Sequence, residues 1–248
     1  MVEIFDYQLD TDNWEIFPKH IWTDPYVVFH GTSSFHSNSI EQGGWVKGHS
    51  PFDIADATEL VRVLELPLIK PFDIATVCDL TTAKTLKSYI AANQFDQFRL
   101  SFSYLSSQCA LFSTGKSKGG QTLGNVREAK KNIEAAMTAN PSLQGVLTEP
   151  INRLYNLADE IERASGVVYA IKLPKELDGI TEEYGVIHSN ISIPKELIIG
   201  KVIISNDIDL NSLDRAILKE RNKAKLLQIG HLGLILGRRK YNGEYLQT

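Results

Sequence analysis

The clearest strand in the sequence is an apolar run from Val167 to Leu173, which follows a helical segment at residues 149–164. Gly166 separates the two, as glycine commonly ends a helix. Further strands are predicted at 26–30, 98–104, 184–188, 191–193, 201–205 and 232–236, and further helices at 33–41, 57–66, 81–93, 106–112, 126–137 and 213–227. Since helices interrupt short strands without a regular alternation of strand and helix, the pattern favours one α+β domain over residues 1–248.

Composition excludes several classes of protein. The chain has 248 residues, two cysteines and a formal net charge of −4. Two cysteines are too few for a disulfide framework, and the acidic balance disfavours broad electrostatic binding to nucleic acid. No apolar run approaches the roughly 20 residues that cross a bilayer, and residues 1–12 lack the apolar core of a cleavable secretory signal. We therefore expect a globular protein of a reducing compartment, without a membrane partner.

The most informative segment for chemistry is the end of the strand at 26–30, where His30 is followed by Gly31 and Thr32. Glycine has no Cβ, so a ligand can approach its backbone closely. The helix expected from Ser33 would present the unpaired N–H groups of its first turn to an anionic or amide ligand. These residues indicate a ligand site, with a core histidine in a strand-to-helix turn as the alternative.

Phe29-His30-Gly31-Thr32, followed by Ser39-Ile40-Glu41-Gln42-Gly43, resembles the first motif of the ADP-ribosyltransferase superfamily. The similarity is to its histidine-type branch, which includes diphtheria-like toxins and poly-ADP-ribose polymerases. It implies a split antiparallel β-sheet core with helical insertions and NAD+ as the co-substrate. His30 would then donate a hydrogen bond to the adenosine-side ribose or the diphosphate. The backbone of Gly31 would pair with the nicotinamide carboxamide, and Thr32 would lie in the same site.

A second segment, at about 98–115, resembles the part of this family that encloses nicotinamide between two aromatic side chains. Cys109-Ala110 matches a pair of small residues on a helix, and Phe112 matches the aromatic residue that stacks on the ring. At strict spacing the other aromatic position, on the strand, is Ser101, which departs from the family. Either a bulge brings Phe102 or Tyr104 into place, or this wall of the site differs.

A third segment, Glu182-Glu183-Tyr184-Gly185-Val186, resembles the late strand that opens with the catalytic glutamate of the family. Glu183 is the first candidate and Glu182 the second. The carboxylate would stabilise the oxocarbenium-like charge that develops on ribose as nicotinamide leaves. This chemistry needs no metal, and the histidines lack the spacing of metal ligands. The resemblance covers about 25–45, 98–115 and 166–206, whereas 45–95 and 115–165 have no counterpart.

Together these resemblances imply a mono-ADP-ribosyltransferase that moves ADP-ribose from NAD+ to a protein side chain and releases nicotinamide. Such single catalytic domains are similar to bacterial effector toxins, so we expect a protein that is cytoplasmic or delivered into a host cell by a dedicated secretion system. The acceptor would be a host protein, with ubiquitin as one candidate. The alternatives are an RNA 2′-phosphotransferase or nucleic-acid ADP-ribosyltransferase, an NAD+ glycohydrolase, and a degenerate, non-enzymatic binding module. The net charge of −4 disfavours the nucleic-acid alternative.

Overall fold

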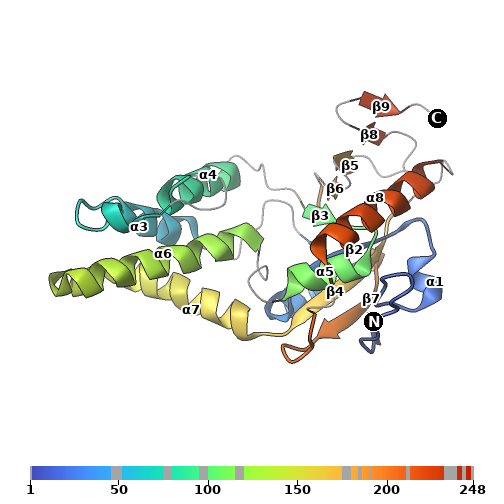
Figure 1. The fold of residues 1–248 in the computed structure, drawn as a ribbon, viewed down its shortest axis with the longest axis horizontal. Coiled ribbons are helices and arrows are strands. Elements are labelled where there is room, and N and C mark those ends of the chain that lie inside the picture. Colours follow the sequence, from blue (N-terminus) through green and yellow to red (C-terminus); the bar gives the residue numbers. More distant parts are fainter. Residues whose placement is uncertain are drawn as a thin grey trace. The chain divides into compact units, whose positions relative to one another are not determined.

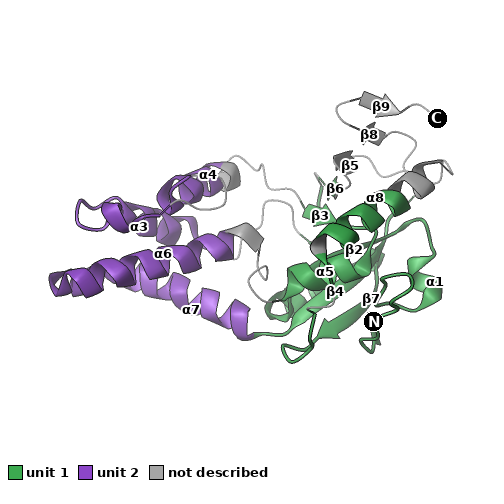
Figure 2. Cartoon of the chain, in the orientation of Figure 1, with its two compact units in different colours: residues 1–47, 99–118, 164–248 green, residues 48–98, 119–163 purple. Residues whose placement is uncertain are grey.

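A computed structural model describes residues 2–45, 52–74, 80–94, 100–114, 120–174, 180–183, 186–189, 191–210, 213–231, 239–241 and 244–246. These residues combine helices with β-sheets, in agreement with the predicted mixed class. The single domain expected over 1–248 divides into two compact units: unit 1 (1–47, 99–118 and 164–248) and unit 2 (48–98 and 119–163) (Figure 2). Unit 1 contains all three segments that resemble the family, apart from residue 98. Unit 2 consists largely of the two stretches that have no family counterpart.

Unit 1 contains a four-stranded sheet with the strand order β1-β7-β4-β2. Figure 1 labels three of these strands, β7, β4 and β2. Its strands are β1 (Glu3–Phe5), β7 (Ile198–Ile204), β4 (Gly166–Lys172) and β2 (Val27–Ser33). The sheet is mixed, not purely antiparallel as expected, because β1 pairs in parallel with β7 while β7, β4 and β2 pair antiparallel. Strand β4 is buried from Gly166 to Ile171, which explains its continuous apolar sequence, since layers cover both of its faces.

A second, antiparallel sheet of unit 1 has the order β3-β6-β5. Its strands are β3 (Leu100–Phe102), β6 (Val186–Ser189) and β5 (Ile180–Glu183). The two sheets meet at an isolated bridge between Phe29 and Ser103, whose backbone groups exchange hydrogen bonds of 2.7 and 2.9 Å. Strand β5 was not predicted, and the strand expected at 191–193 is reduced to one bridge between Trp45 and Ile193.

A short hairpin, β8 (Arg239–Tyr241) with β9 (Glu244–Leu246), forms a third sheet that was also not predicted. The strand expected at 232–236 lies outside the described residues, as do Tyr184 and Gly185. The helices of unit 1 are α1 (Lys19–Trp22), α2 (Ser37–Gly43), α5 (Ser106–Ser113) and α8 (Arg215–His231), with 3₁₀ turns at Ser34–His36 and Lys195–Leu197. Helices α2, α5 and α8 lie within a few residues of the predicted ranges.

Alternate side chains of the large sheet enter two different apolar clusters. Val28, on the same side of β2 as His30, joins a cluster that includes Trp45, Phe102 and Tyr169. On the opposite side, the side chain of Phe29 joins a cluster that contains the α5 residues Cys109 and Ala110 and residues of the N-terminal segment, such as Phe17. Helix α5 therefore covers one face of the sheet, and the face with His30 is covered by Trp45 and the smaller sheet.

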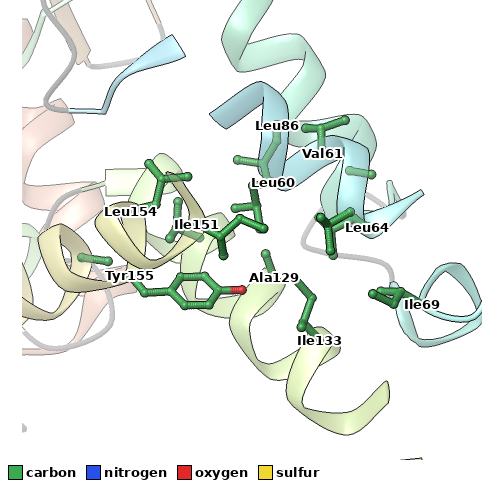
Figure 3. Close-up of a cluster of buried hydrophobic side chains, with 14 of the residues drawn as sticks. Leu60, Val61, Leu64, Ile69, Leu86, Ala129, Ile133, Ile151, Leu154 and Tyr155 are labelled. Carbon is green, nitrogen blue, oxygen red and sulfur yellow. The ribbon is translucent and has the colours of Figure 1, made fainter. Parts of the chain in front are cut away.

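Unit 2 is helical and has its own core (Figure 3). Its helices are α3 (Ile54–Leu64), α4 (Thr82–Gln94), α6 (Gly120–Ala139) and α7 (Glu149–Arg163), with 3₁₀ turns at Lys70–Phe72 and Pro141–Val146. The apolar stripe read from the sequence of α7 is buried, as predicted: Ile151, Leu154, Tyr155, Ala158 and Ile161. Asp53 caps α3 by accepting hydrogen bonds from the N–H groups of Ala55 and Asp56, which explains where this helix begins.

Candidate functional site

The structure brings three polar residues that are distant in sequence into one hydrogen-bonded row. His30 Nδ1 lies 2.8 Å from the carbonyl oxygen of Ser101, and Ser101 Oγ lies 3.1 Å from Nδ1 of His188. His30 is on β2, Ser101 on β3 and His188 on β6, where it is directly opposite Ser101 in the strand register. The row therefore joins the two sheets of unit 1. His188 was not predicted as a site residue, because only the register of β3 against β6 places it there.

The hydrogen bond to Ser101 fixes the tautomer of His30. A carbonyl oxygen can only accept, so His30 Nδ1 carries the proton and donates it. Burial lowers the pKa of His30 below its ordinary value of 6.5, and the hydrogen bond to Ser101 offsets this only in part. At neutral pH the imidazole is therefore uncharged, and its Nε2 is a hydrogen-bond acceptor. This differs from the expected donation to NAD+, and it favours a hydroxyl group as the partner of His30.

The ring of His30 is held by aromatic neighbours. The ring centroids of Trp45 and Phe102 lie 5.4 and 5.8 Å from that of His30, both in edge-to-face orientation. Trp45 also contacts Tyr169 at 5.2 Å. Trp45 was not predicted as a site residue, although a tryptophan directly after the Gly43-Gly44 stop was a visible signal.

A second polar cluster consists of Glu41, Tyr169 and Lys201, and the ring of Tyr169 also contacts Trp45. Glu41 Oε1 accepts hydrogen bonds from the hydroxyl of Tyr169 at 2.9 Å and from Nζ of Lys201 at 2.6 Å. Tyr169 is fully buried and lies opposite His30 in the register of β2 with β4. Glu41 thus ties α2 to two strands of the sheet, and it thereby fixes the segment that carries Trp45.

Gly31 is required by packing of the protein against itself. A Cβ built at Gly31 would lie 2.0 Å from the carbonyl oxygen of Cys109 and 2.8 Å from its carbonyl carbon. The thiol of Cys109 lies 3.2 Å from the carbonyl oxygen of Phe29, and burial raises the pKa of this thiol to about 12. Helix α5 therefore packs directly on the backbone of β2, at the residue that the sequence assigned to the nicotinamide carboxamide.

The candidate aromatic walls differ sharply in exposure. Phe102 and Tyr104 are each 2% exposed and belong to the core cluster, so neither ring offers a face to a ligand. Phe112, near the end of α5, is 50% exposed and is available for stacking. Thr32 is half-buried and lies on the same side of β2 as His30. Ser101, where the family has an aromatic residue, is exposed.

The two candidate glutamates occupy consecutive positions at the end of β5. In the register with β6, Glu183 is opposite Val186 and Glu182 is opposite Ile187. Because opposite residues share a face and faces alternate along a strand, position 183 belongs to the same face of the small sheet as Ser101 and His188. Position 182 belongs to the face of Ile187, which is buried. Their side chains are not among the described ones, and the register favours Glu183 as the candidate.

No family model, curated protein or solved structure matches this chain. Among the described residues, no group of three or more His, Cys, Asp or Glu side chains could hold a metal ion. The described helices include none with the length and apolar character needed to cross a membrane.

Proposed function

We propose that this chain is a mono-ADP-ribosyltransferase that uses NAD+ and modifies a protein side chain. The observation that supports it is the convergence of three short segments selected from the sequence alone. The segments around residues 30, 101 and 183 are far apart in the chain, yet β2 meets β3 at the Phe29–Ser103 bridge and β3 pairs with the β5–β6 hairpin. A chance resemblance in three core segments would not require these three strands to be neighbours.

The chemistry assigns a separate role to each segment. Cleavage of the nicotinamide–ribose bond develops positive charge on the ribose, and the carboxylate of Glu183 would stabilise it. Neutral His30 would accept a hydrogen bond at Nε2 from a ribose hydroxyl and so orient the dinucleotide. Exposed Phe112 would stack on the nicotinamide ring. The backbone N–H and C=O of Gly31 would pair with the carboxamide from the edge of β2, because α5 covers the face of the strand at this residue.

The net charge of the whole chain no longer favours a protein over a nucleic acid as the acceptor of ADP-ribose. Unit 2 contains nine Lys or Arg and thirteen Asp or Glu residues, so the net charge of −4 belongs entirely to that unit. Unit 1, which would carry the site, has equal numbers of acidic and basic residues. Only labelling can therefore decide the class of acceptor.

The test is incubation of the full chain with NAD+ labelled in its adenosine part, together with a cell lysate, while released nicotinamide is quantified by chromatography. Glu183→Gln should lower nicotinamide release by about 10²- to 10³-fold, which is typical for loss of one transition-state electrostatic contact. Glu182→Gln is the neighbouring comparison, and Glu196→Gln, at an exposed position, is the matched control. His30→Asn keeps a donor for the Ser101 carbonyl but removes the Nε2 acceptor, and it should raise KM for NAD+.

Label on a protein band that depends on Glu183 supports the proposal. Free ADP-ribose as the sole product would instead indicate a glycohydrolase, and label on RNA or DNA would indicate a nucleic-acid acceptor. If NAD+ neither binds nor is consumed, the enzyme proposal fails and a binding module becomes the better description.

A further inference from the structure

The pair formed by Ser101 and His188 has the arrangement of a nucleophile and its base. Ser101 Oγ lies 3.1 Å from His188 Nδ1, and the hydroxyl is exposed. The two residues are directly opposite each other on β3 and β6, so backbone hydrogen bonds on both strands hold the pair in place. A serine hydroxyl is a weak nucleophile unless a neighbouring base accepts its proton.

Ser101 is also close to the groups that would bind NAD+. Its carbonyl oxygen accepts the hydrogen bond of His30, and its position in the small sheet is on the same face as position 183. Ser101 therefore lies between His30, which would orient the dinucleotide, and position 183, which has the candidate carboxylate. The family that the sequence resembles carries an aromatic residue at the position of Ser101, whereas this chain has a serine hydroxyl there.

On the basis of the proposed function, we propose that Ser101 is an acceptor of ADP-ribose and that the protein modifies itself there. Ser101 Oγ forms a bond to the anomeric carbon of the nicotinamide-side ribose while the bond from that carbon to nicotinamide breaks. The bonding electrons leave with neutral nicotinamide, and the hydroxyl proton passes to His188 Nδ1 and then to water. The products are an O-linked ADP-ribosyl serine, nicotinamide and one proton.

Self-modification at this position would stop further turnover. The ADP-ribosyl group would stay covalently attached beside His30 and fill the place that the next NAD+ needs. With NAD+ as the only substrate, nicotinamide release should therefore show a burst of one equivalent per chain. The reaction would also be intramolecular, so its rate constant should not depend on protein concentration.

The experiment follows the full chain with NAD+ alone, by intact mass, by peptide mapping and by nicotinamide release. A single adduct at Ser101 is expected, and it should resist neutral hydroxylamine, which cleaves ADP-ribosyl esters of Asp and Glu. Ser101→Ala should lose this adduct, whereas Ser101→Thr keeps a hydroxyl and should retain an adduct at position 101. His188→Asn places an amide near the position of Nδ1 without its basicity, and it should slow the adduct by about 10²-fold or more.

Two matched controls carry the same changes at exposed positions elsewhere in the chain: Ser88→Ala on α4 and His20→Asn on α1. Both should behave as the wild type. Nicotinamide release without an adduct at Ser101, or an adduct that forms equally fast in His188→Asn, would overturn this inference and leave the proposed function standing. Absence of nicotinamide release from the wild type with NAD+ alone would also overturn this inference, whereas absence of release with the lysate present would overturn the proposed function and the inference with it.

Discussion

Replacement of Gly31 by alanine separates two explanations for this glycine. A Cβ at this position must move from 2.0 Å to at least 3.4 Å from the carbonyl oxygen of Cys109 to reach ordinary van der Waals contact. The obstacle is helix backbone, which cannot swing away as a side chain can. Helix α5 would have to retreat from β2, and it would loosen the contact of the Cys109 thiol with the carbonyl of Phe29.

The expected loss of stability follows from two opposing effects. Overpacking of this kind costs about 1–3 kcal/mol, because the backbone has to shift. Alanine also restricts the unfolded chain, which stabilises the folded state by about 0.4–1 kcal/mol wherever the backbone conformation suits it. Gly31 does not have a positive φ, so this gain applies. The net expectation is a loss of about 1–2 kcal/mol.

Urea unfolding monitored by tryptophan fluorescence measures this loss in the correct unit, since Trp14, Trp22 and Trp45 all belong to unit 1. With a slope of about 2 kcal/mol/M, the midpoint should fall by about 0.5–1 M. Gly43→Ala is the matched control, because a Cβ there has no atom within 4 Å and Gly43 ends α2. That variant should be unchanged or up to about 1 kcal/mol more stable.

A Gly31→Ala variant with an unchanged or higher midpoint would refute the packing argument. If such a variant also lost NAD+ binding, close approach of the ligand would be the reason for the glycine. If its midpoint falls and NAD+ binding weakens in proportion, the glycine acts on the site through α5.

Three further predictions concern ionisation and unit 2. The pKa of His30 is lowered in the folded state, so near and below pH 6.5 the unfolded chain binds more protons than the folded chain. The free energy of unfolding should therefore fall as the pH falls from 7.5 to 5.5. Urea midpoints measured at these two pH values should show a smaller decrease for His30→Asn than for the wild type. With a pKa of about 12, the Cys109 thiol should resist alkylation at pH 8 in the native protein and react after unfolding. Labelling is measured by mass spectrometry on the peptide that contains Cys109, so that Cys78 does not contribute. Labelling of Cys109 in the native protein would contradict this prediction. In unit 2, Arg153 donates hydrogen bonds to both oxygens of the buried Asp56 carboxylate. Arg153→Met leaves this carboxylate without the arginine, so the far-UV circular dichroism transition should move to lower urea while the fluorescence transition stays unchanged. Equal shifts in both signals would show that the two units unfold together.

Local sequence patterns predicted elements whose residues repeat at a regular spacing. The strand at 167–173 and the helix at 149–164 lie within a few residues of β4 and α7, because an apolar run and an apolar stripe are local properties. Strand β5 was missed because Ile180–Glu183 has no alternation of apolar and polar residues. Strand β1 was missed for a similar reason, as three residues at the chain start carry no periodic signal.

The candidate site shows the limit of such patterns more clearly. His30 and Ser101 were selected as positions in motifs, but the row that joins them to His188 depends on strand register between segments more than 70 residues apart. Register is set by how whole sheets pack, and no short motif encodes it. The division into two units was likewise not visible, because unit 2 is assembled from two separate stretches of chain that form one apolar core.

The groups that hold the row together lie mainly on the side of the sheet opposite His30. Asn222 of α8 accepts hydrogen bonds at Oδ1 from the hydroxyl of Ser103 and the N–H of Tyr104, at 2.9 and 3.0 Å. Ser103 forms the bridge with Phe29, and Cys109 contacts the carbonyl of Phe29 from α5. The bridge residue Phe29 is next to His30 on β2. Helices α5 and α8 therefore fix the distance between the two sheets at the point where the row passes from one sheet to the other. Substitutions in these helices should therefore alter the site without contacting any ligand, and a loss of NAD+ binding in such variants would reflect misplacement of His30 and Ser101.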